Sequence, residues 1–153
     1  MRDVTALARR FKVDINTGTA GTPVWTTLMG ILELAPPKVD PVIQKSADYD
    51  DEGWGGNQVT GNDWSMEATV RRKLSAAGMY DPGQEYLRSR KGKTGADALA
   101  QMRCYERDGG VEAYSGWAVI GWEDDKGKPE DTASAKISFT GDGPLLDIAN
   151  PAA

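Results

Sequence analysis

Alternation of apolar and polar residues with a period of two is the feature that most constrains the fold. In the segment 64–70, WSMEATV, every second residue is apolar and the residues between are polar. Successive side chains of a β-strand point to opposite faces, so the pattern predicts a strand with one buried face. The segments 11–16 and 133–140 repeat the pattern. We therefore expect a mainly β protein.

Three more segments are expected to be strands. Residues 24–34 and 113–122 are rich in β-branched and aromatic residues, which favours strands that lie between two layers. Residues 98–107 would also suit a helix, but their place between strands favours a strand.

One short helix is indicated after residue 80. Asp81 is a natural N-cap, Pro82 suits the first turn, and Gln84 follows the cap by three positions. Gly92 can end the segment. The expected architecture is a two-sheet β-sandwich or partly closed barrel with this helix on its flank.

The length, net charge and composition of the chain limit its possible functions. The 153 residues suit a single domain, 1–153. A net charge of −5 argues against nucleic-acid binding, which depends on Lys and Arg. The absence of histidine removes the usual general base and the commonest metal ligand, so we expect no enzyme, no catalytic residues and no cofactor. The single cysteine, Cys104, is expected to pack in the core.

The N-terminal sequence MRDVTALARRFKVD has charges around a short apolar stretch, unlike a secretion signal. No run reaches the roughly 18 apolar residues of a membrane helix. We expect a protein made in the cytoplasm, without a membrane partner.

The segment 35–62 is expected to be one long loop, because it begins with Pro36 and Pro37 and also contains Pro41. A connection of that length in a small domain is usually functional or mobile. It contains the stretch 48–56, DYDDEGWGG, with four carboxylates and three glycines.

This acidic stretch was compared with a calcium-binding EF-hand loop. Asp48, Asp50, Glu52 and Gly53 fit its first half, but Val59 occupies the position that requires a glutamate. We expect no specific metal site. Adjacent carboxylates on turns are generally solvated, which also disfavours acid–base catalysis.

Residues 91–95, KGKTG, match the end of a phosphate-binding loop. The earlier glycine of that motif is replaced by Leu87, and the segment follows a helix instead of a strand. We interpret it as a basic helix exit.

Trp54 differs from the other tryptophans because it lies among glycines and acids in the expected loop. It either folds back onto its own domain or anchors an interface, as buried aromatics with polar rims often do.

The order of segments carries a resemblance. FKVDINTG, VWTTLMGILELAP, DYDDEGW, WSMEATVRRKL, DPGQEYLRSRKG and ISFTGDGPLLDIANP follow one another between Leu7 and Pro151. In this order the chain resembles the major tail proteins, or tail tube proteins, of long-tailed, non-contractile bacteriophages.

The resemblance implies a structural virion protein of the phage tail, assembled in the bacterial host cytoplasm. Hexameric rings would stack into a tube through which DNA passes during ejection without specific binding. Residues 1–10 would form an N-terminal arm and residues 35–62 a loop between rings. Further implied partners are a tape-measure protein in the lumen, a tail terminator and distal tail or baseplate proteins. The acidic balance also suggests a neutral-to-acidic inner wall.

The acidic stretch would then pair with basic residues of a neighbouring copy, either 71–73 or the basic helix exit. The candidate assembly residues are Asp48, Asp50, Asp51, Glu52, Trp54, Arg71, Arg72 and Lys73.

Other functions remain open at this stage. A tail terminator or other single-ring tail protein would share the fold without polymerising. A small β-sandwich module could instead bind a carbohydrate or peptide through Trp54 and the nearby acids. A hydrolase is weakened most by the lack of histidine.

Overall fold

The computed structural model describes residues 2–153, which form one antiparallel sheet of eight strands with a single short α-helix. The strands are β1 (Phe11–Asn16), β2 (Trp25–Thr27), β3 (Ile31–Lys45), β4 (Asn57–Arg71), β5 (Leu99–Glu106), β6 (Ala113–Asp124), β7 (Ser134–Gly141) and β8 (Leu146–Asp147). The helix is α1 (Pro82–Arg88), and the 3-10 turns are η1 (Ala8–Arg10), η2 (Tyr49–Asp51) and η3 (Gly95–Ala98). The expectation of a mainly β protein with one short helix is confirmed.

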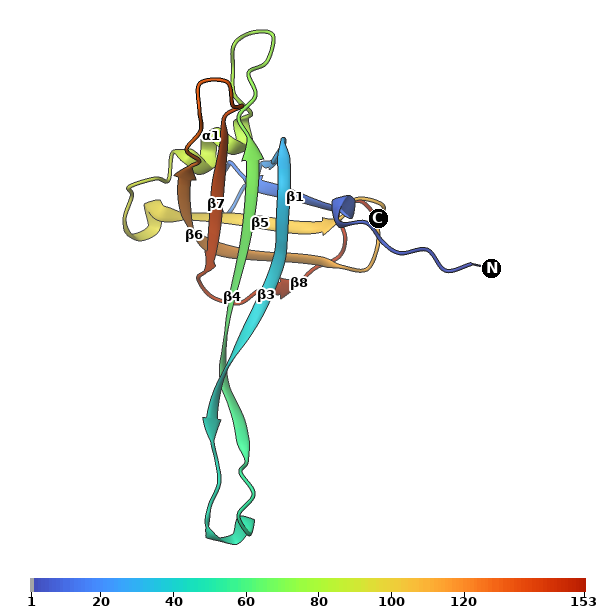
Figure 1. Ribbon diagram of the computed structural model, residues 1–153, viewed down its shortest axis with the longest axis vertical. Coiled ribbons are helices and arrows are strands. Elements are labelled where there is room, and N and C mark those ends of the chain that lie inside the picture. The colour runs from blue at the N-terminus through green and yellow to red at the C-terminus, as the bar shows by residue number, and fades with distance from the viewer. Residues whose placement is uncertain (1) are drawn as a thin grey trace.

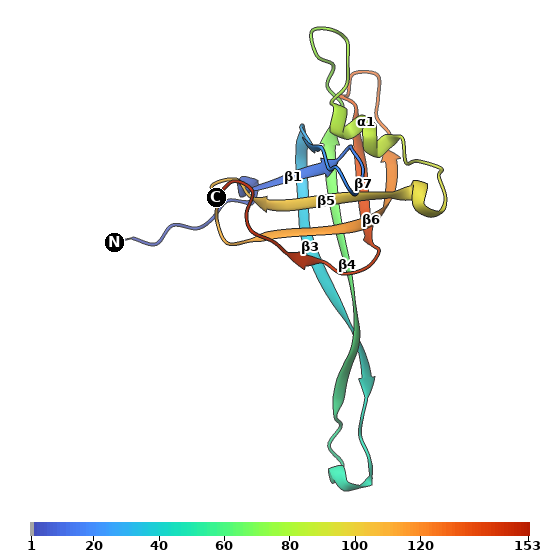
Figure 2. The same cartoon turned by 180° about the vertical axis from the view of Figure 1, so that it is seen from behind.

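The strand order is β2-β1-β5-β6-β7-β4-β3, with β8 also beside β6. The two expected layers are therefore two halves of one continuous sheet. Strand β6 joins them, because residues 113–119 pair with β5 and residues 118–124 pair with β7. Figures 1 and 2 show that β1 and β5 cross β3, β4 and β7 at a steep angle, with β6 bending between the two groups. The curled sheet matches the expected partly closed barrel.

The core fills the space inside the curled sheet. Its least exposed side chains come from both halves and from α1, and they include Val13, Ile15, Met66, Val70, Leu87, Met102, Cys104, Ile137 and Phe139. Six of them, Val13, Ile15, Met66, Val70, Ile137 and Phe139, occupy the apolar positions of the three alternating segments, so the pattern in the sequence predicted this part of the inner face. The expectation that Cys104 packs in the core is confirmed.

Trp64 fixes how β4 meets the neighbouring strands. Its indole lies so close to Gly116 and Gly141 that a Cβ at either position would lie 2.7 Å or less from a ring atom. The indole N–H donates to the carbonyl of Gly143 at 3.0 Å, so the buried ring has its one polar atom satisfied.

Helix α1 begins as the sequence predicts. The Asp81 side chain accepts a hydrogen bond from the Gln84 backbone N–H at 3.1 Å, and Pro82 is the first helical residue. The amide of Gln84, which is 1% exposed, donates to the carbonyls of Met29 and Arg71 at 2.7 and 3.1 Å. These bonds hold the helix beside the start of β3 and the end of β4.

The prediction of one strand over residues 24–34 is wrong. The segment is divided into β2 and the start of β3 by a turn in which Gly30 has φ = +79°. That left-handed conformation favours glycine, and a Cβ here would lie 3.0 Å from the carbonyl oxygen of Arg71. Residues of high β propensity on both sides hid the turn.

The prediction of one long loop over residues 35–62 is also wrong. Strand β3 continues to Lys45 and β4 starts at Asn57, leaving only 46–56 as the connection. The three prolines are accommodated because β3 ends the strand order and has a free edge, where a missing N–H costs no ladder bond. Pro36 and Pro37 also coincide with a register shift between Ala35 and Lys38.

Within residues 2–153, no helix has the length and apolar character needed to cross a membrane.

Candidate functional site

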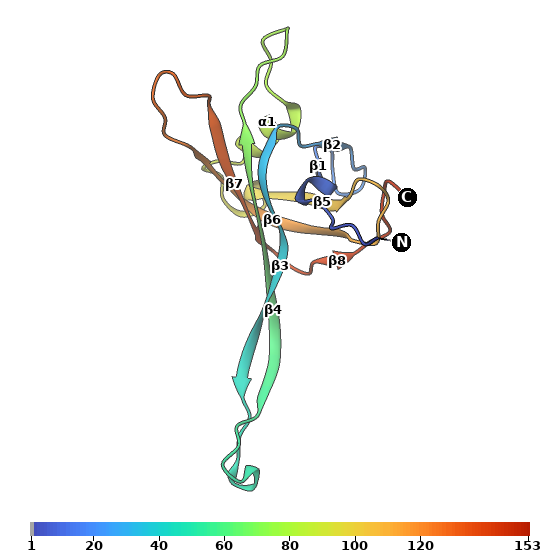
Figure 3. The same ribbon diagram turned by 45° about the vertical axis from the view of Figure 1, so that its right-hand side comes forward.

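The long β3–β4 hairpin is the most distinctive part of the molecule. Its lower half projects far from the rest of the sheet and twists strongly, as Figures 1 and 3 show. An isolated two-stranded hairpin is only marginally stable in water. The projecting half is therefore a natural contact surface for another molecule.

One face of the projecting half is apolar. Direct cross-strand partners lie on the same face, and the register pairs Val39 with Trp64 and Ile43 with Val59. Residues 39, 41 and 43 alternate along β3. A register shift between Val42 and Ile43 leaves Thr60 as an extra residue on β4, so Val59 lies beside Ile43, on the side that carries buried Trp64. Val39, Ile43 and Val59 are 51%, 55% and 57% exposed. We call these three residues the hairpin stripe.

Sequence reasoning missed the hairpin stripe. The alternation is present in the segment 38–45, KVDPVIQK, but Pro41, with Pro36 and Pro37 before the segment, was interpreted as a sign of a loop.

The tip of the hairpin carries two exposed aromatic residues. Tyr49 lies on η2, and Trp54 lies in the connection before β4 and is 82% exposed. The structure does not fold Trp54 back onto the domain. A large indole that remains in solvent is typical of a surface that is covered in an assembly.

The tip is also acidic and tightly turned. The Asp48 side chain accepts a hydrogen bond from the Asp50 backbone N–H at 2.9 Å. Glu52 and Gly53 both have positive φ, of 50° and 85°. Asp50 and Glu52 are exposed, whereas the side chain of Asp51 lies outside the described part of the structure.

The basic candidates lie at the other end of the same strand. Arg71 is the last residue of β4, and Lys73 follows it in the loop that leads to α1. Both are exposed, and neither forms an ion pair within residues 2–153. The tip and these cations are thus separated by the full length of β4, so one subunit does not bring them together.

Arg72 has a different environment from its neighbours. Its side chain is 9% exposed and donates to Gln84 at 2.9 Å and to Glu85 at 2.5 Å. Its guanidinium also stacks on Tyr80 and Trp122, 4.0 and 5.0 Å from the ring centroids. Arg72 therefore fastens α1 to the sheet within its own subunit.

Glu85 is the shared acceptor in this cluster. Hydrogen bonds from Arg88, and then from Arg72, lower the pKa of its carboxyl group against the opposing effect of burial. At neutral pH the Glu85 carboxylate is charged and bonded to both arginines, which fits a structural role in holding α1 on the sheet.

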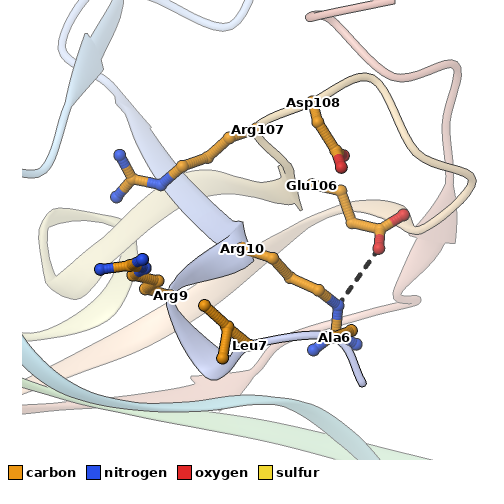
Figure 4. A pocket seen from close by; sticks show the side chains of 7 residues that line it. All are labelled: Ala6, Leu7, Arg9, Arg10, Glu106, Arg107 and Asp108. Carbon is orange, nitrogen blue, oxygen red and sulfur yellow. Dashed lines mark hydrogen bonds and ion pairs between the residues drawn. The ribbon is translucent and has the colours of Figure 1, made fainter. Parts of the chain in front are cut away.

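The N-terminal arm joins the body at a pocket beside the β5–β6 turn. Arg10 donates to Glu106 at 3.1 Å and to Glu112 at 2.8 Å, which pins η1. These contacts, above all the one with Glu112, raise the pKa of Arg10. Arg9 and Arg107 extend to the opposite side of the pocket (Figure 4). Of the expected arm 1–10, Ala6 and Leu7 line this pocket, residues 2–5 extend away from the body (Figure 1), and Met1 lies outside the described residues.

The outward face of β4 and β7 is polar. Ser65, Glu67 and Thr69 of β4 pair with Thr140, Ser138 and Lys136 of β7. Glu67 and Lys136 form an exposed ion pair at 3.6 Å. The face combines hydroxyl groups with charges of both signs.

The described residues contain no cluster of metal-ligating side chains. Across residues 2–153, no three side chains of His, Cys, Asp or Glu are grouped so that they could hold a metal ion.

The fold is similar to those of solved tail structures. A chain of the tail of an empty gene transfer agent particle, computed with C6 symmetry, has a TM-score of 0.65 and 13% identity, covering 95% of this chain and 100% of that one. A chain of the six-fold symmetrised baseplate of the anti-feeding prophage has a TM-score of 0.66 and 10% identity, covering 95% and 97%. The SPP1 tail tube has a TM-score of 0.60 and 17% identity, covering 93% and 78%.

No family model and no curated protein sequence matches the chain. The structural matches nevertheless confirm that the chain has a tail-tube-like fold, as the order of sequence segments predicted.

Proposed function

We propose that this chain is a structural subunit of a phage-type tail tube. Six copies close into a ring, and the rings stack into a hollow tube. The observation that carries the proposal is the β3–β4 hairpin, which presents its hairpin stripe outside any core of its own subunit. A neighbouring subunit that covers this stripe would remove the exposed apolar surface from water.

The free edge of β3 supports the same arrangement. An open edge strand exposes unpaired backbone groups and invites uncontrolled association. A closed ring satisfies such edges with a fixed number of copies, because a heterologous contact that closes does not propagate. The matched structures with C6 or six-fold symmetry make six the expected number.

The polar outward face of β4 and β7 suits the wall of the channel. Its Ser and Thr hydroxyls and its balanced Glu67–Lys136 pair offer DNA no continuous run of cations. DNA would pass without being held, which is the neutral-to-acidic wall that the net charge suggested.

A tube subunit would also have a defined place and defined partners in the virion. The subunit is a non-enzymatic component of a virion tail with long, non-contractile architecture. Its further partners would be a tape-measure protein inside the tube and terminator and distal tail proteins at the two ends.

A subunit that forms one ring without stacking is the second candidate. The match to a chain of a six-fold baseplate favours this alternative, because a subunit in a baseplate can form a single ring, whereas a tube subunit forms many stacked rings.

Negative-stain electron microscopy of the purified protein over a concentration series, with mass photometry on the same samples, tests the proposal. Hollow tubes are the expected result. Single rings that never stack would favour the second candidate, and a monomer with a ligand groove would favour a binding module.

A further inference from the structure

The two terminal segments of the chain meet at one turn. Figures 1 and 3 show the N-terminal arm and the last residues of the chain on the same side of the molecule, beside the turn 107–112 that joins β5 to β6. Both segments form hydrogen bonds to this β5–β6 turn or to the strand end that precedes it. We call residues 2–10 the arm and residues 148–153 the strap.

The arm is held to the body mainly through Arg10. Its guanidinium donates to Glu106 at 3.1 Å and to Glu112 at 2.8 Å. Within residues 2–153, the other charged residues of the arm form no ion pair. Ala6 and Leu7 are exposed and line an open cavity of about 590 Å³ instead of packing on the sheet (Figure 4). The arm therefore has little to hold it if Arg10 loses its partners.

The strap is held through Asn150. Its side-chain amide N–H groups donate to the main-chain carbonyls of Glu106 at 2.9 Å and of Gly110 at 2.7 Å. The side-chain oxygen of Asn150 accepts from the Ala152 backbone N–H at 2.8 Å, which orients the amide toward the turn. One side chain thus fastens the strap to both ends of the turn.

Glu106 belongs to both sets of contacts. Its carboxylate binds Arg10 of the arm, and its main-chain carbonyl accepts from Asn150 of the strap. The second carboxylate oxygen accepts from the Glu112 backbone N–H at 3.2 Å, across the turn. A Cβ at Gly110 would overlap this carboxylate, so the glycine leaves room for it. None of these bonds joins the strap to the arm directly, but the conformation of the turn affects both.

We propose that the strap controls the position of the arm through the β5–β6 turn. Asn150 keeps the turn in the conformation that places the Glu106 carboxylate against Arg10. When the strap leaves the turn, two carbonyls lose their donor, the turn relaxes and the arm detaches. A molecule that bound the detached strap would therefore release the arm at the other end of the chain. This device goes beyond the proposed function, because it operates within one subunit.

Trypsin cleavage after Arg9, followed by mass spectrometry, tests the coupling. A protease needs flexible backbone around the bond it cleaves, so the cleavage rate reports how often the arm detaches. Asn150→Ala removes the amide of the strap, and Arg10→Gln removes the anchor of the arm. Ser134→Ala is the matched control, because it removes a side-chain hydrogen bond to Asp125 beside the β6–β7 turn. All proteins are compared at a dilution at which mass photometry shows the same oligomeric state.

The strap variant should release the arm and leave the core closed. Asn150→Ala should speed cleavage after Arg9 at least about fivefold, because the turn loses two hydrogen bonds. Arg10→Gln should have an effect at least as large. The double variant should be cleaved no faster than Arg10→Gln alone, since the strap then has no anchored arm to control. Ser134→Ala should be cleaved like the wild type, and labelling of buried Cys104 should stay equally slow in all four variants.

Three results would overturn the coupling. Asn150→Ala could be cleaved at the wild-type rate. The two single effects could multiply in the double variant, which would make strap and arm independent. Labelling of Cys104 could accelerate in step with cleavage, which would mean that Asn150 stabilises the whole fold and not the arm. Each result leaves the tube function untouched, because cleavage and labelling are measured whether or not the protein forms tubes.

Discussion

Val39 lies directly opposite Trp64 in the β3–β4 ladder, yet Trp64 is 4% exposed and Val39 is 51% exposed. The pair marks the point where the hairpin leaves the body of the protein. Above it, the apolar face of β4 is covered by the curled sheet. Below it, the same face continues without a cover, which is the structural basis for proposing an assembly role.

The hairpin stripe should be needed for assembly and not for folding. We expect Ile43→Asp to change the free energy of unfolding by no more than about 1 kcal/mol, because the side chain is already exposed. Assembly should require at least about a tenfold higher concentration, because the new charge would have to be buried against a neighbour. Urea unfolding and mass photometry measure the two effects.

Val42→Asp is the matched control for the hairpin stripe. Val42 is 40% exposed and is adjacent to Ile43, but it pairs with Gly61 and lies on the other face of the hairpin. Its substitution should affect assembly less. Equal assembly by Ile43→Asp and the wild type would refute a role for the stripe.

Arg72 should contribute to stability instead of assembly. Removing it in Arg72→Ala leaves Glu85 and Gln84 without their partner and the rings of Tyr80 and Trp122 without the stacked guanidinium. We expect a loss of about 2–4 kcal/mol in the free energy of unfolding. Lys73→Ala, one position away and exposed, should cost no more than about 0.5 kcal/mol. An Arg72→Ala protein as stable as Lys73→Ala would contradict the fastening role.

The pH dependence of stability should include a contribution from Glu85. Its pKa is lowered in the folded protein by Arg88 and Arg72, so below its usual value the unfolded chain binds the proton more readily. The stabilisation is present above the unfolded pKa and is lost as the pH falls through the folded pKa. Glu85→Gln should therefore lower stability at pH 7 and lose less stability on acidification. Urea unfolding of both proteins at pH 7 and pH 3 measures this, and parallel curves would exclude the contribution.

Cys104 should be unreactive in the native protein. It is 0% exposed, and burial raises the pKa of its thiol to about 12, so the thiolate is scarce at pH 8. We expect a chromogenic disulfide reagent to label Cys104 only after unfolding in urea. In a Ser75→Cys variant the exposed new thiol should react at once, leaving one thiol protected. Rapid labelling of the native wild type would mean that the core opens readily.

The strands could be predicted wherever alternation was uninterrupted. The segment around Trp64, the β1 strand and the β7 strand were recognised because their apolar residues line one face. The cap at Asp81 was equally predictable, because a capping interaction depends on residues only three positions apart.

Features that depend on distant parts of the chain could not be predicted. Pro36, Pro37 and Pro41 are compatible with a strand only because β3 lies at a free edge, and strand order is not visible in a local pattern. The internal role of Arg72 depends on α1 folding back over β4. The sequence left two interpretations of Trp54 open. The structure shows that the indole is exposed, and its role at an interface stays a prediction.

A six-fold cryo-electron microscopy reconstruction of the assembled protein tests the central claim most directly. We predict a hollow tube of stacked hexameric rings in which a neighbouring subunit covers Val39, Ile43 and Val59. A monomer at every concentration, or a ring in which the hairpin projects into solvent with these residues uncovered, would contradict the claim.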